Sequence, residues 1–368
     1  MKAQVLIVGS GLTGATIARC LVDQGISVIV LDRRSEIGGN LADYTDPHGI
    51  RIHKYGPHYF RTGCLKIWQF VTRFDSFYNF EARIATEVDG RLYNWPILEK
   101  DLCELAGDNW RYNLGSNNIH KSLESACLEI MPRLAYEMFV KEYNEKQWGT
   151  TCDLLSASLC KRFDVRSDDE TRLTPHKKFQ GLPNKGYSAW LANMLNGIEV
   201  ILNCDYLKCK TDIQSDYVVF TGPIDEFFNY DLGRLKYRAQ HRTKEIYMHS
   251  QVQSYVQVNN PQHSGGEHIR TIEWKHLTNS KVSNDLTILT RETPYTPDDA
   301  NCYEYPFMDD ENHRLFNCYK KKAQAISRTI ICGRLGEYRY YDMDQAIGSA
   351  FYIFRKLLNR IKNERESG

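Results

Sequence analysis

A glycine-rich turn at the start of the chain constrains the fold more than any other feature. The apolar run at 5–8 is followed by Gly9, Gly11 and Gly14 in a Gly-x-Gly-x-x-Gly pattern, and residues 13–24 then have a helical pattern. Each glycine meets a steric demand: a tight turn after the strand, close approach of backbone to a pyrophosphate, and packing of the helix on the sheet. The free N–H groups and the positive end of that helix would face the pyrophosphate. We therefore predict a strand–turn–helix unit that binds a dinucleotide.

A carboxylate and a second glycine turn follow at the distance that such a unit requires. The apolar run at 28–31 ends in Asp32, about 20 residues beyond the glycines, where a carboxylate accepts hydrogen bonds from ribose hydroxyls. Gly38, Gly39 and Asn40 come next. This arrangement resembles flavoproteins of the glutathione reductase type, so we expect FAD rather than NAD. No second motif of this kind follows a strand later in the chain, so we expect no separate nicotinamide domain.

The composition excludes several classes of protein. The 368 residues include 47 Lys and Arg and 46 Asp and Glu, with no basic run interleaved with aromatic residues, so a general nucleic-acid surface is not expected. The 11 cysteines lack metal-ligand spacing, which favours reduced thiols and no metal. Nowhere does the chain contain the roughly 18 consecutive apolar residues of a membrane span. We therefore expect a cytoplasmic protein.

The periodicity predicts an α/β fold: an FAD-binding Rossmann-like domain with a helical insert and an antiparallel β-sheet insert that together form the substrate cleft. Buried strands are expected at 198–203, 217–222 and 329–334, and a final helix at 343–361. In the helical insert, the apolar positions expected to face a shared core include Ile130, Leu134, Met138 and Val140. The expected division is an FAD-binding domain at 1–80, 180–235 and 314–368, a helical insert at 97–160, a β-sheet insert at 81–96 and 236–313, and a mobile loop at 161–179. A solvated connector is the alternative for that loop.

Five segments together carry a resemblance to a known family. In chain order they are His53–Phe60, Phe139–Gly149 with its Lys-Gln-Trp-Gly, Lys161-Arg162, Phe179–Pro183, and Gly333–Asp344 with its Arg-Tyr-Tyr-Asp-Met-Asp. Over nearly its whole length the chain resembles the UDP-galactopyranose mutase family. The resemblance implies an isomerase that interconverts a nucleotide-linked hexopyranose and hexofuranose, using reduced FAD without net redox change. It also implies a covalent adduct between flavin N5 and the sugar, and supply of furanose for cell-surface polysaccharide.

The resemblance assigns the diphosphate of the substrate to two arginines and two tyrosines. Arg162 and Arg270 would hold the departing diphosphate as catalytic groups, since planar guanidinium groups suit phosphate oxygens. Tyr305 and Tyr340 would donate hydrogen bonds to the same phosphates. A surface ion pair is the alternative for Arg270.

Further roles are implied on the helical insert and around the flavin. Phe139 and Tyr143 would grip the nucleobase, and Asn144 and Trp148 would line the cleft, with core packing as the alternative for the aromatic residues. His58 would act catalytically at the flavin, with a structural histidine as the alternative. The residues implied for the cofactor are Gly9, Gly11, Thr13, Gly14, Asp32, Arg33, Gly39, Asn40, His53, Thr221, Gly222, Arg334, Asp342, Met343 and Asp344.

Four differences from the usual family pattern fall around the sugar and the nucleotide. The chain has Arg61 in place of a usual histidine, Ala82 and Leu98 in place of asparagines, and no tyrosine at 168–178. A polar group left unpaired in a buried cleft is costly, so the loss of amides at Ala82 and Leu98 favours a sugar with fewer hydroxyls or a bulkier apolar substituent. Arg61 would meet an added acceptor such as an acetamido group. We expect a substrate such as a dTDP-6-deoxyhexose or a UDP-N-acetylhexosamine.

Two other functions share parts of this pattern. An FAD amine oxidase or desaturase has the same N-terminal motif, but the convergent arginines and tyrosines favour a diphosphate. A flavin-bound protein that has lost catalysis and serves as a binding partner in polysaccharide assembly is the second. For the mutase, the expected partners are a nucleotide-sugar substrate, an external reductant, either NAD(P)H or a reductase, and a second copy of the chain in a homodimer, with neither nucleic acid nor membrane.

Overall fold

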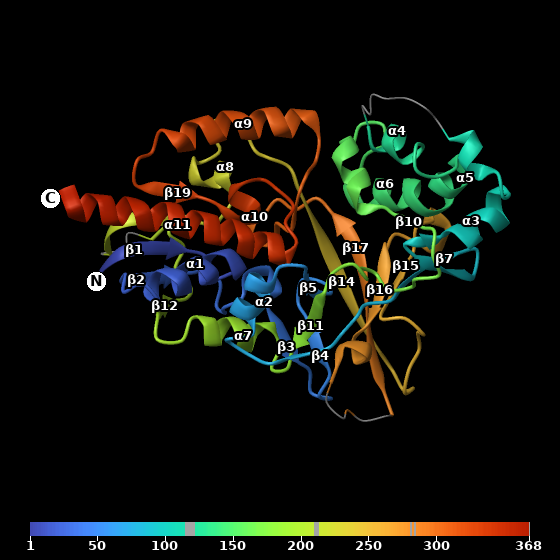
Figure 1. Ribbon diagram of the computed structural model, residues 1–368, viewed down its shortest axis with the longest axis horizontal. Coiled ribbons are helices and arrows are strands. Elements are labelled where there is room, and N and C mark those ends of the chain that lie inside the picture. Colours follow the sequence, from blue (N-terminus) through green and yellow to red (C-terminus); the bar gives the residue numbers. More distant parts are fainter. Residues whose placement is uncertain (115–121, 210–212, 280–281, 283–284, 368) are drawn as a thin grey trace.

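A five-stranded parallel sheet carries the N-terminal glycine turn. The computed structural model describes residues 1–114, 122–209, 213–279, 282 and 285–367 (Figure 1). All neighbouring strands of this sheet run parallel, and Val8 at the end of the central strand lies between Leu31 and Phe220. The strands expected after the first two are therefore present. In spatial order the sheet consists of β12 (Glu199–Ile201), β2 (Val28–Leu31), β1 (Lys2–Val8), β13 (Gln214–Phe220) and β19 (Thr329–Ile331).

Two helices from opposite ends of the chain pack together against this sheet. Helix α1 (Leu12–Val22) follows the glycine turn and packs along α11 (Met343–Ser367) (Figure 1). Helix α11 continues six residues beyond the expected end at Ile361. The prediction stopped at the last apolar residue, but the polar residues that follow are good helix formers and continue the helix in solvent. Near them lie α7 (Tyr187–Met194), α8 (Ile224–Phe227), α9 (Asp310–Gln324) and α10 (Gly333–Gly336).

A second, seven-stranded sheet is built from two distant parts of the chain. Its pairs are antiparallel except for the parallel pairing of β15 with β7, which joins the segment near residue 85 to the segment near residue 258. This confirms the expected, mainly antiparallel insert. In spatial order the strands are β18 (Tyr305–Pro306), β14 (Tyr237–Tyr247), β17 (Thr287–Tyr295), β16 (Arg270–Glu273), β15 (Gln257–Asn259), β7 (Ile84–Val88) and β8 (Arg91–Trp95).

The helical insert has its own apolar core, but one expected member faces solvent. Val140 is fully buried there, whereas Leu134 is 45% exposed. The reason is a break in the helix: residues 128–132 are not helical and a new helix begins at Arg133, so the 3.6-residue spacing that placed Ile130 and Leu134 on one face does not run through this segment. The elements here are α3 (Glu99–Ala106), α4 (Leu123–Cys127), α5 (Arg133–Tyr136), the π-helical turn η3 (Glu137–Lys141), α6 (Glu142–Trp148) and the 3₁₀ helix η4 (Ala157–Arg162).

The charge-dense loop at 161–179 is docked on the rest of the molecule. Strand β10 (Val165–Arg166) pairs with β9 (Ile97–Leu98), and Arg172 forms ion pairs with Glu170 at 2.6 Å and Glu81 at 3.0 Å. The mobility of this loop stays a prediction, as do the boundaries of the four parts. The remaining elements are η1 (Gly39–Leu41), β3 (Asp43–Thr45), β4 (Arg51–His53), β5 (Phe60–Thr62), α2 (Leu65–Val71), β6 (Phe77–Tyr78), η2 (Trp110–Asn113), β11 (Phe179–Pro183), η5 (His263–Gly265), η6 (Trp274–Leu277) and η7 (Ala300–Cys302).

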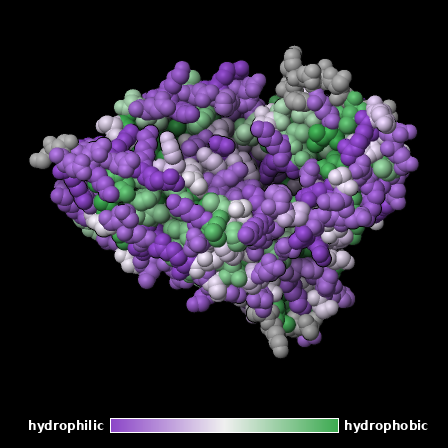
Figure 2. Space-filling view, in the orientation of Figure 1, coloured by the Kyte–Doolittle hydropathy of each residue, from purple (hydrophilic) through white to green (hydrophobic). Residues whose placement is uncertain are grey.

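The surface in the same view is predominantly hydrophilic and is hollowed between the half that carries α9 and the half that carries α6 (Figure 2). Over the described ranges, no helix combines the length and apolar character needed to cross a membrane.

The exposure of Leu134 predicts that its truncation costs less stability than truncation of a buried residue of the helical insert. Met131 is 1% exposed in the same core. We expect Met131→Ala to lower the free energy of unfolding by about 2–4 kcal/mol, because it leaves a cavity. Leu134→Ala should change it by less than about 0.5 kcal/mol. Urea unfolding followed by circular dichroism measures both values, and equal losses would contradict the placement of Leu134.

Candidate active site

A cavity of about 310 Å³ runs along the carboxyl ends of the parallel strands. This edge is where open α/β sheets bind their ligands. The expected cofactor residues that line this first cavity are Gly9, Gly11, Thr13, Asp32, Arg33, Gly39, Asn40, Thr221, Gly222, Arg334, Asp342 and Met343.

The glycines of the first turn fit a dinucleotide. Gly9 has φ of 109°, and a side chain there would collide with Thr221. A side chain on Gly14, which does not line the cavity, would collide with the carbonyl of Gly9, so this glycine serves the packing of α1. Gly11 pairs with the second turn at Gly38, and no side chain caps α1. The first N–H groups of the helix are therefore available to a pyrophosphate.

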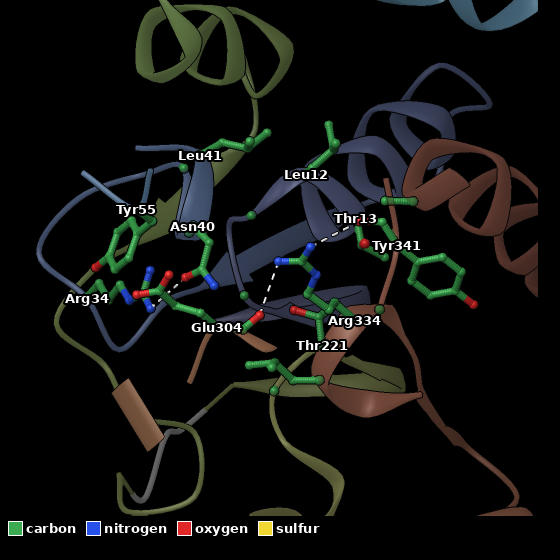
Figure 3. A pocket seen from close by; sticks show the side chains of 18 of the residues that line it. Leu12, Thr13, Arg34, Asn40, Leu41, Tyr55, Thr221, Glu304, Arg334 and Tyr341 are labelled. Atoms are coloured by element: carbon green, nitrogen blue, oxygen red, sulfur yellow. Dashed lines mark hydrogen bonds between the residues drawn. The ribbon is translucent and has the colours of Figure 1, made fainter. Parts of the chain in front are cut away.

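Two buried nitrogen atoms in this cavity lack partners in the part of the chain that the structure describes. They are Nη1 of Arg34 and Nδ1 of His58. Nη2 of Arg34 donates to Oδ1 of Asn40 at 3.0 Å and to the carbonyl of Asn301 at 2.9 Å (Figure 3). Buried polar atoms are normally hydrogen-bonded, so these two are placed to meet polar atoms of a ligand. Together with the glycine turns, they fit the polar groups of FAD.

Asp32 has a second task besides the expected contact with a ribose. Its carboxylate accepts hydrogen bonds from the backbone N–H and the hydroxyl of Ser10, at 2.7 and 2.6 Å, and from the backbone N–H of Arg34 at 2.9 Å. It therefore also fixes the first glycine turn. Arg33 lines the cavity too, but its guanidinium pairs with Glu226 at 2.6 and 2.8 Å.

The C-terminal side of the cavity is held by Arg334. Its Nη1 donates to the carbonyl of Glu304 at 3.1 Å, and its Nη2 donates to the carbonyl of Tyr341 at 3.2 Å (Figure 3). Asp342 lies 3.5 Å from Arg61, which also lines this cavity. Arg61 therefore points at the same end of the cavity as the residues that follow Arg334.

Five of the residues singled out from the sequence lie outside the walls of both main cavities. Asp344 forms an ion pair with Lys177 at 3.2 Å, which ties the start of α11 to the 161–179 loop. The carbonyl of Ala82 accepts a hydrogen bond from the N–H of Leu173 at 2.8 Å. Ala82 and Leu98 are both buried. These three, with His53 and Gly14, are not among the residues that line either cavity. Their assigned roles stay predictions.

His53 supports the turn that carries His58. It is 3% exposed, packs against Tyr187 and Trp274 with ring centroids 5.3 and 5.2 Å away, and its Nδ1 accepts a hydrogen bond from the N–H of His58 at 3.1 Å. Burial lowers the pKa of His53 to about 4. Burial and the neighbouring His53 hold the pKa of His58 well below its usual value, so His58 is neutral at pH 7.

A second cavity, of about 190 Å³, opens between the helical insert, the seven-stranded sheet and the 161–179 loop. The helices supply Phe139, Tyr143, Asn144 and Trp148, and Arg162 ends the 3₁₀ helix η4. The residues expected to hold the nucleobase and one expected diphosphate ligand thus lie in one cavity. Residues that the sequence did not single out also line it: Ile84, Trp95, Gln147, Leu159, Phe163, Leu173, Gln257 and Asn259.

The aromatic residues of this cavity also pack in the core. Trp148 contacts Phe307 edge-on at 5.8 Å, and Phe139 contacts Tyr93 in the same way at 5.0 Å. Asn144 donates from its side chain to the carbonyl of Val140 at 2.7 Å. The same aromatic side chains thus pack in the core and line the cavity, so the two alternatives given for them do not exclude each other.

Three residues line both cavities: Arg270, Tyr305 and Tyr340. The rings of the two tyrosines are stacked 5.9 Å apart, and Cζ of Arg162 lies 3.8 Å from the centroid of the Tyr340 ring. Cζ of Arg334 lies 4.3 Å from the same centroid. Burial alone would raise the pKa of Tyr340, but the two arginines outweigh it and lower the pKa. The shared wall is thus a concentration of positive charge and phenol groups.

Arg270 belongs to a row of charged residues on three neighbouring strands. Arg270, Glu292 and Arg242 lie directly opposite one another on β16, β17 and β14. Glu292 is fully buried and accepts from Nε of Arg270 at 2.5 Å and from Nε of Arg242 at 2.9 Å. Arg242 also donates to Glu304 at 2.7 and 2.8 Å. Glu292 uses only Nε of Arg270, and neither Nη group of Arg270 has a hydrogen-bond partner among the described residues.

The opposite charges of this row keep one another ionised. Burial would lower the pKa of Arg270, but Glu292 raises it well above its usual value. Burial would likewise raise the pKa of Glu292, but Arg270 and Arg242 lower it. Sequence reasoning missed Glu292, Arg242 and Glu304. The sequence did contain a signal. These charged residues lie within predicted strands, in which polar and apolar residues otherwise alternate.

The buried state of His53 predicts a pH dependence of stability. Its pKa of about 4 lies below the ordinary value of 6.5, so between these values the unfolded chain binds more protons than the folded chain. Stability from this group is therefore present above about pH 6.5 and falls as the pH approaches 4, by up to about 3 kcal/mol. We expect His53→Gln, which keeps an acceptor for His58, to flatten this dependence in urea unfolding at pH 7, 6 and 5. Equal slopes for variant and parent would contradict the buried neutral state.

The comparisons with known proteins agree with this geometry. A family model described as UDP-galactopyranose mutase matches residues 138–340, and one described as an NAD(P)-binding Rossmann-like domain matches residues 7–74. The dTDP-fucopyranose mutase of Escherichia coli is 31% identical over 99% of this chain and 100% of that protein. A probable UDP-galactopyranose mutase of Klebsiella pneumoniae is 29% identical over 98% of this chain and 96% of its own length.

Solved structures show the same fold. A crystal structure of reduced UDP-galactopyranose mutase superposes with a TM-score of 0.78 at 14% identity, covering 97% of this chain and 96% of the other. A redesigned putrescine oxidase superposes with a TM-score of 0.63 at 11% identity, which is a likeness of fold alone. The first family model spans more than half of the chain, and the Escherichia coli relative aligns over its full length. The chain therefore belongs to the UDP-galactopyranose mutase family.

Proposed function

We propose that the chain is a flavin-dependent mutase that interconverts the pyranose and furanose forms of a hexose carried on a nucleoside diphosphate. The observation that carries this proposal is the wall shared by the two cavities, where Arg270, Tyr305 and Tyr340 line both and Arg162 stacks on Tyr340. A substrate in the second cavity would reach a cofactor in the first only at this wall. Cations and phenol donors at such a point suit a diphosphate that has to leave a sugar and return to it.

Bound in the first cavity, FAD in its reduced form supplies an electron-rich nitrogen that acts as nucleophile toward the anomeric carbon. The protein has to keep the diphosphate close while its bond to the sugar is broken. Arg162 ends the 3₁₀ helix η4 and Arg270 begins β16, so two separate segments each bring one cation to the second cavity. Neutral His58, which lines the flavin cavity, can donate or accept one hydrogen bond without adding charge.

We further propose that the sugar differs from galactose. The E. coli relative is named for dTDP-fucopyranose. Ala82 does not itself line a cavity, but its carbonyl holds the backbone of Leu173, which lines the second cavity together with Ile84 and Leu159. An apolar wall suits a sugar that lacks a hydroxyl, whereas a site built to bond that hydroxyl would leave a polar group unpaired. A dTDP-6-deoxyhexose is therefore the first candidate, and a UDP-N-acetylhexosamine that meets Arg61 is the second.

Two partners are part of the proposal. The reduced state requires an external reductant, either NAD(P)H or a reductase, since the sequence contains no second dinucleotide motif. The homodimer stays a prediction that sedimentation can test. The oxidase alternative rests on fold alone, and it requires oxidised flavin at the start of turnover, the opposite of the mutase.

A substrate panel tests the proposed reaction. The protein reduced with dithionite should convert dTDP-fucopyranose to a furanose isomer, detected by chromatography, while the oxidised protein should not. UDP-galactopyranose and UDP-N-acetylgalactosamine complete the panel. Fastest turnover of UDP-galactopyranose would contradict the altered sugar, turnover only by oxidised enzyme with oxygen consumption would favour the oxidase, and no turnover of any member would contradict the mutase.

The diphosphate clamp predicts a graded loss of rate. Arg162→Ala and Arg270→Ala should each lower kcat by about 10²- to 10³-fold, because each removes a charged donor that acts on the departing group. Glu292→Gln should lower kcat by roughly ten-fold, because Arg270 loses its charged anchor but keeps a hydrogen-bond acceptor. The matched control is Arg291→Gln, since Arg291 is exposed next to Glu292. Flavin absorbance should be unchanged in all four, and near-parental rates in both alanine variants would remove the clamp.

A further inference from the structure

A buried lysine on the far side of α6 has no place in the site described above. Lys146 is 7% exposed and lines neither main cavity, whereas Tyr143, Asn144, Gln147 and Trp148 of the same helix line the second one. Its ammonium donates to four backbone carbonyl groups: those of Asn260 at 2.8 Å, Gln262 at 3.0 Å, Gly266 at 3.1 Å and His268 at 3.0 Å.

All four carbonyl groups belong to one loop, residues 260–269, which connects β15 to β16. The loop is wrapped around the ammonium as oxygen ligands surround a metal cation. A second contact comes from the preceding turn of α6, where the carboxylate of Glu142 accepts from the backbone N–H of His263 at 2.6 Å. Glu142 and Lys146 are four residues apart and so lie on the same face of the helix. This face carries one charge of each sign, and both are used by the loop.

The charge of Lys146 is what this arrangement requires. Four partly buried carbonyl groups converge on one point, and they would lose their shared donor if the ammonium were removed. An ammonium has three donors of equal strength and a full charge, so it can satisfy a crowded set of oxygen atoms. A planar guanidinium cannot direct its donors to one point in this way.

The two ends of the loop are cavity residues. Asn259 ends β15 and Arg270 begins β16, and the two lie opposite each other in the strand pair. Both line the second cavity. The backbone N–H of Asn260 donates to the carbonyl of Ile269 at 2.8 Å, so the loop continues the strand pair by one step. A shift of the loop would therefore move Asn259 and Arg270 with it.

We propose that Lys146 is a positioning residue that fixes the width of the substrate cavity. It ties the helix that carries Tyr143 and Trp148 to the loop that ends in Arg270, so that the groups assigned to the nucleotide and to the diphosphate keep a constant separation. This proposal rests on the proposed function, because it is the nucleotide part of the substrate that has to fit between these walls. Lys146 itself touches no ligand.

The test separates an effect on substrate binding from effects on the reaction rate and on folding. Lys146→Met keeps the length of the side chain and removes its charge. With flavin-loaded protein, titration with dTDP and with UDP, followed by the fluorescence of Trp95 and Trp148 in the cavity, should show Kd raised about ten-fold or more, because small misplacements of binding groups are costly. KM for the sugar nucleotide should rise by a similar factor, while kcat changes less than about three-fold.

Two controls keep the result interpretable. Lys141→Met, in an exposed position just before α6, should match the parent protein in every measurement. Hydrogen exchange should show faster exchange of residues 260–269 and of α6 in Lys146→Met, with the flavin absorbance and the β1–α1 segment unchanged. If Lys146→Met does not fold, Lys146→Gln, which keeps two donors without charge, undergoes the same measurements.

The outcomes distinguish the two proposals. Unchanged Kd values together with unchanged exchange of residues 260–269 would overturn the role of Lys146. A proportional fall in kcat with constant Kd would also overturn it, since that pattern belongs to a group acting on the reaction itself. Failure of the parent protein to bind any nucleoside diphosphate would contradict the proposed function, and the exchange measurement would then decide whether Lys146 holds the loop.

Discussion

The site depends on a row of opposite charges that crosses the seven-stranded sheet. Glu292 lies between Arg270 and Arg242, and Arg242 reaches on to Glu304. Taking four charges out of water is costly, and the cost is offset only when each charge meets its partner with good geometry. The register of β16, β17 and β14 provides that geometry, because a slip by one residue would turn each side chain to the other face. Strand pairing thus places one guanidinium on the wall between the two cavities.

The rest of the molecule can be understood as support for this wall. The parallel sheet places the cofactor cavity on one side, and α6 with the 161–179 loop places the second cavity on the other. Tyr340 stacks on Tyr305 and contacts Arg162 and Arg334, two arginines that come from different parts of the chain. Each side chain would be unremarkable on its own. Positive charge dominates around the Tyr340 ring: Arg162 and Arg334 each lower the pKa of Tyr340 by more than Asp342 raises it.

Sequence reasoning succeeded where local sterics or a strong pattern decided the outcome. Gly9 and Gly14 occupy positions where a side chain would collide with neighbouring atoms, so the turn could be predicted from its letters. It failed where a local pattern was interrupted, as at Leu134, because the apolar spacing continues across residues 128–132, where the helix is broken. It also missed Glu292 and gave Lys146 no role, since the partners of both are distant in sequence and meet them only through strand pairing and helix docking.

The parallel pairing of β15 with β7 has a consequence for how the chain is made. The hairpin of β7 and β8 is complete once residue 95 has been synthesised, but the strand that covers the other edge of β7 ends at Asn259. During translation this edge stays uncovered while more than a hundred further residues emerge. Contacts between such distant segments form slowly, and an open strand edge attracts other chains. The nascent protein is therefore most exposed to misassembly before the middle of the insert sheet has been synthesised.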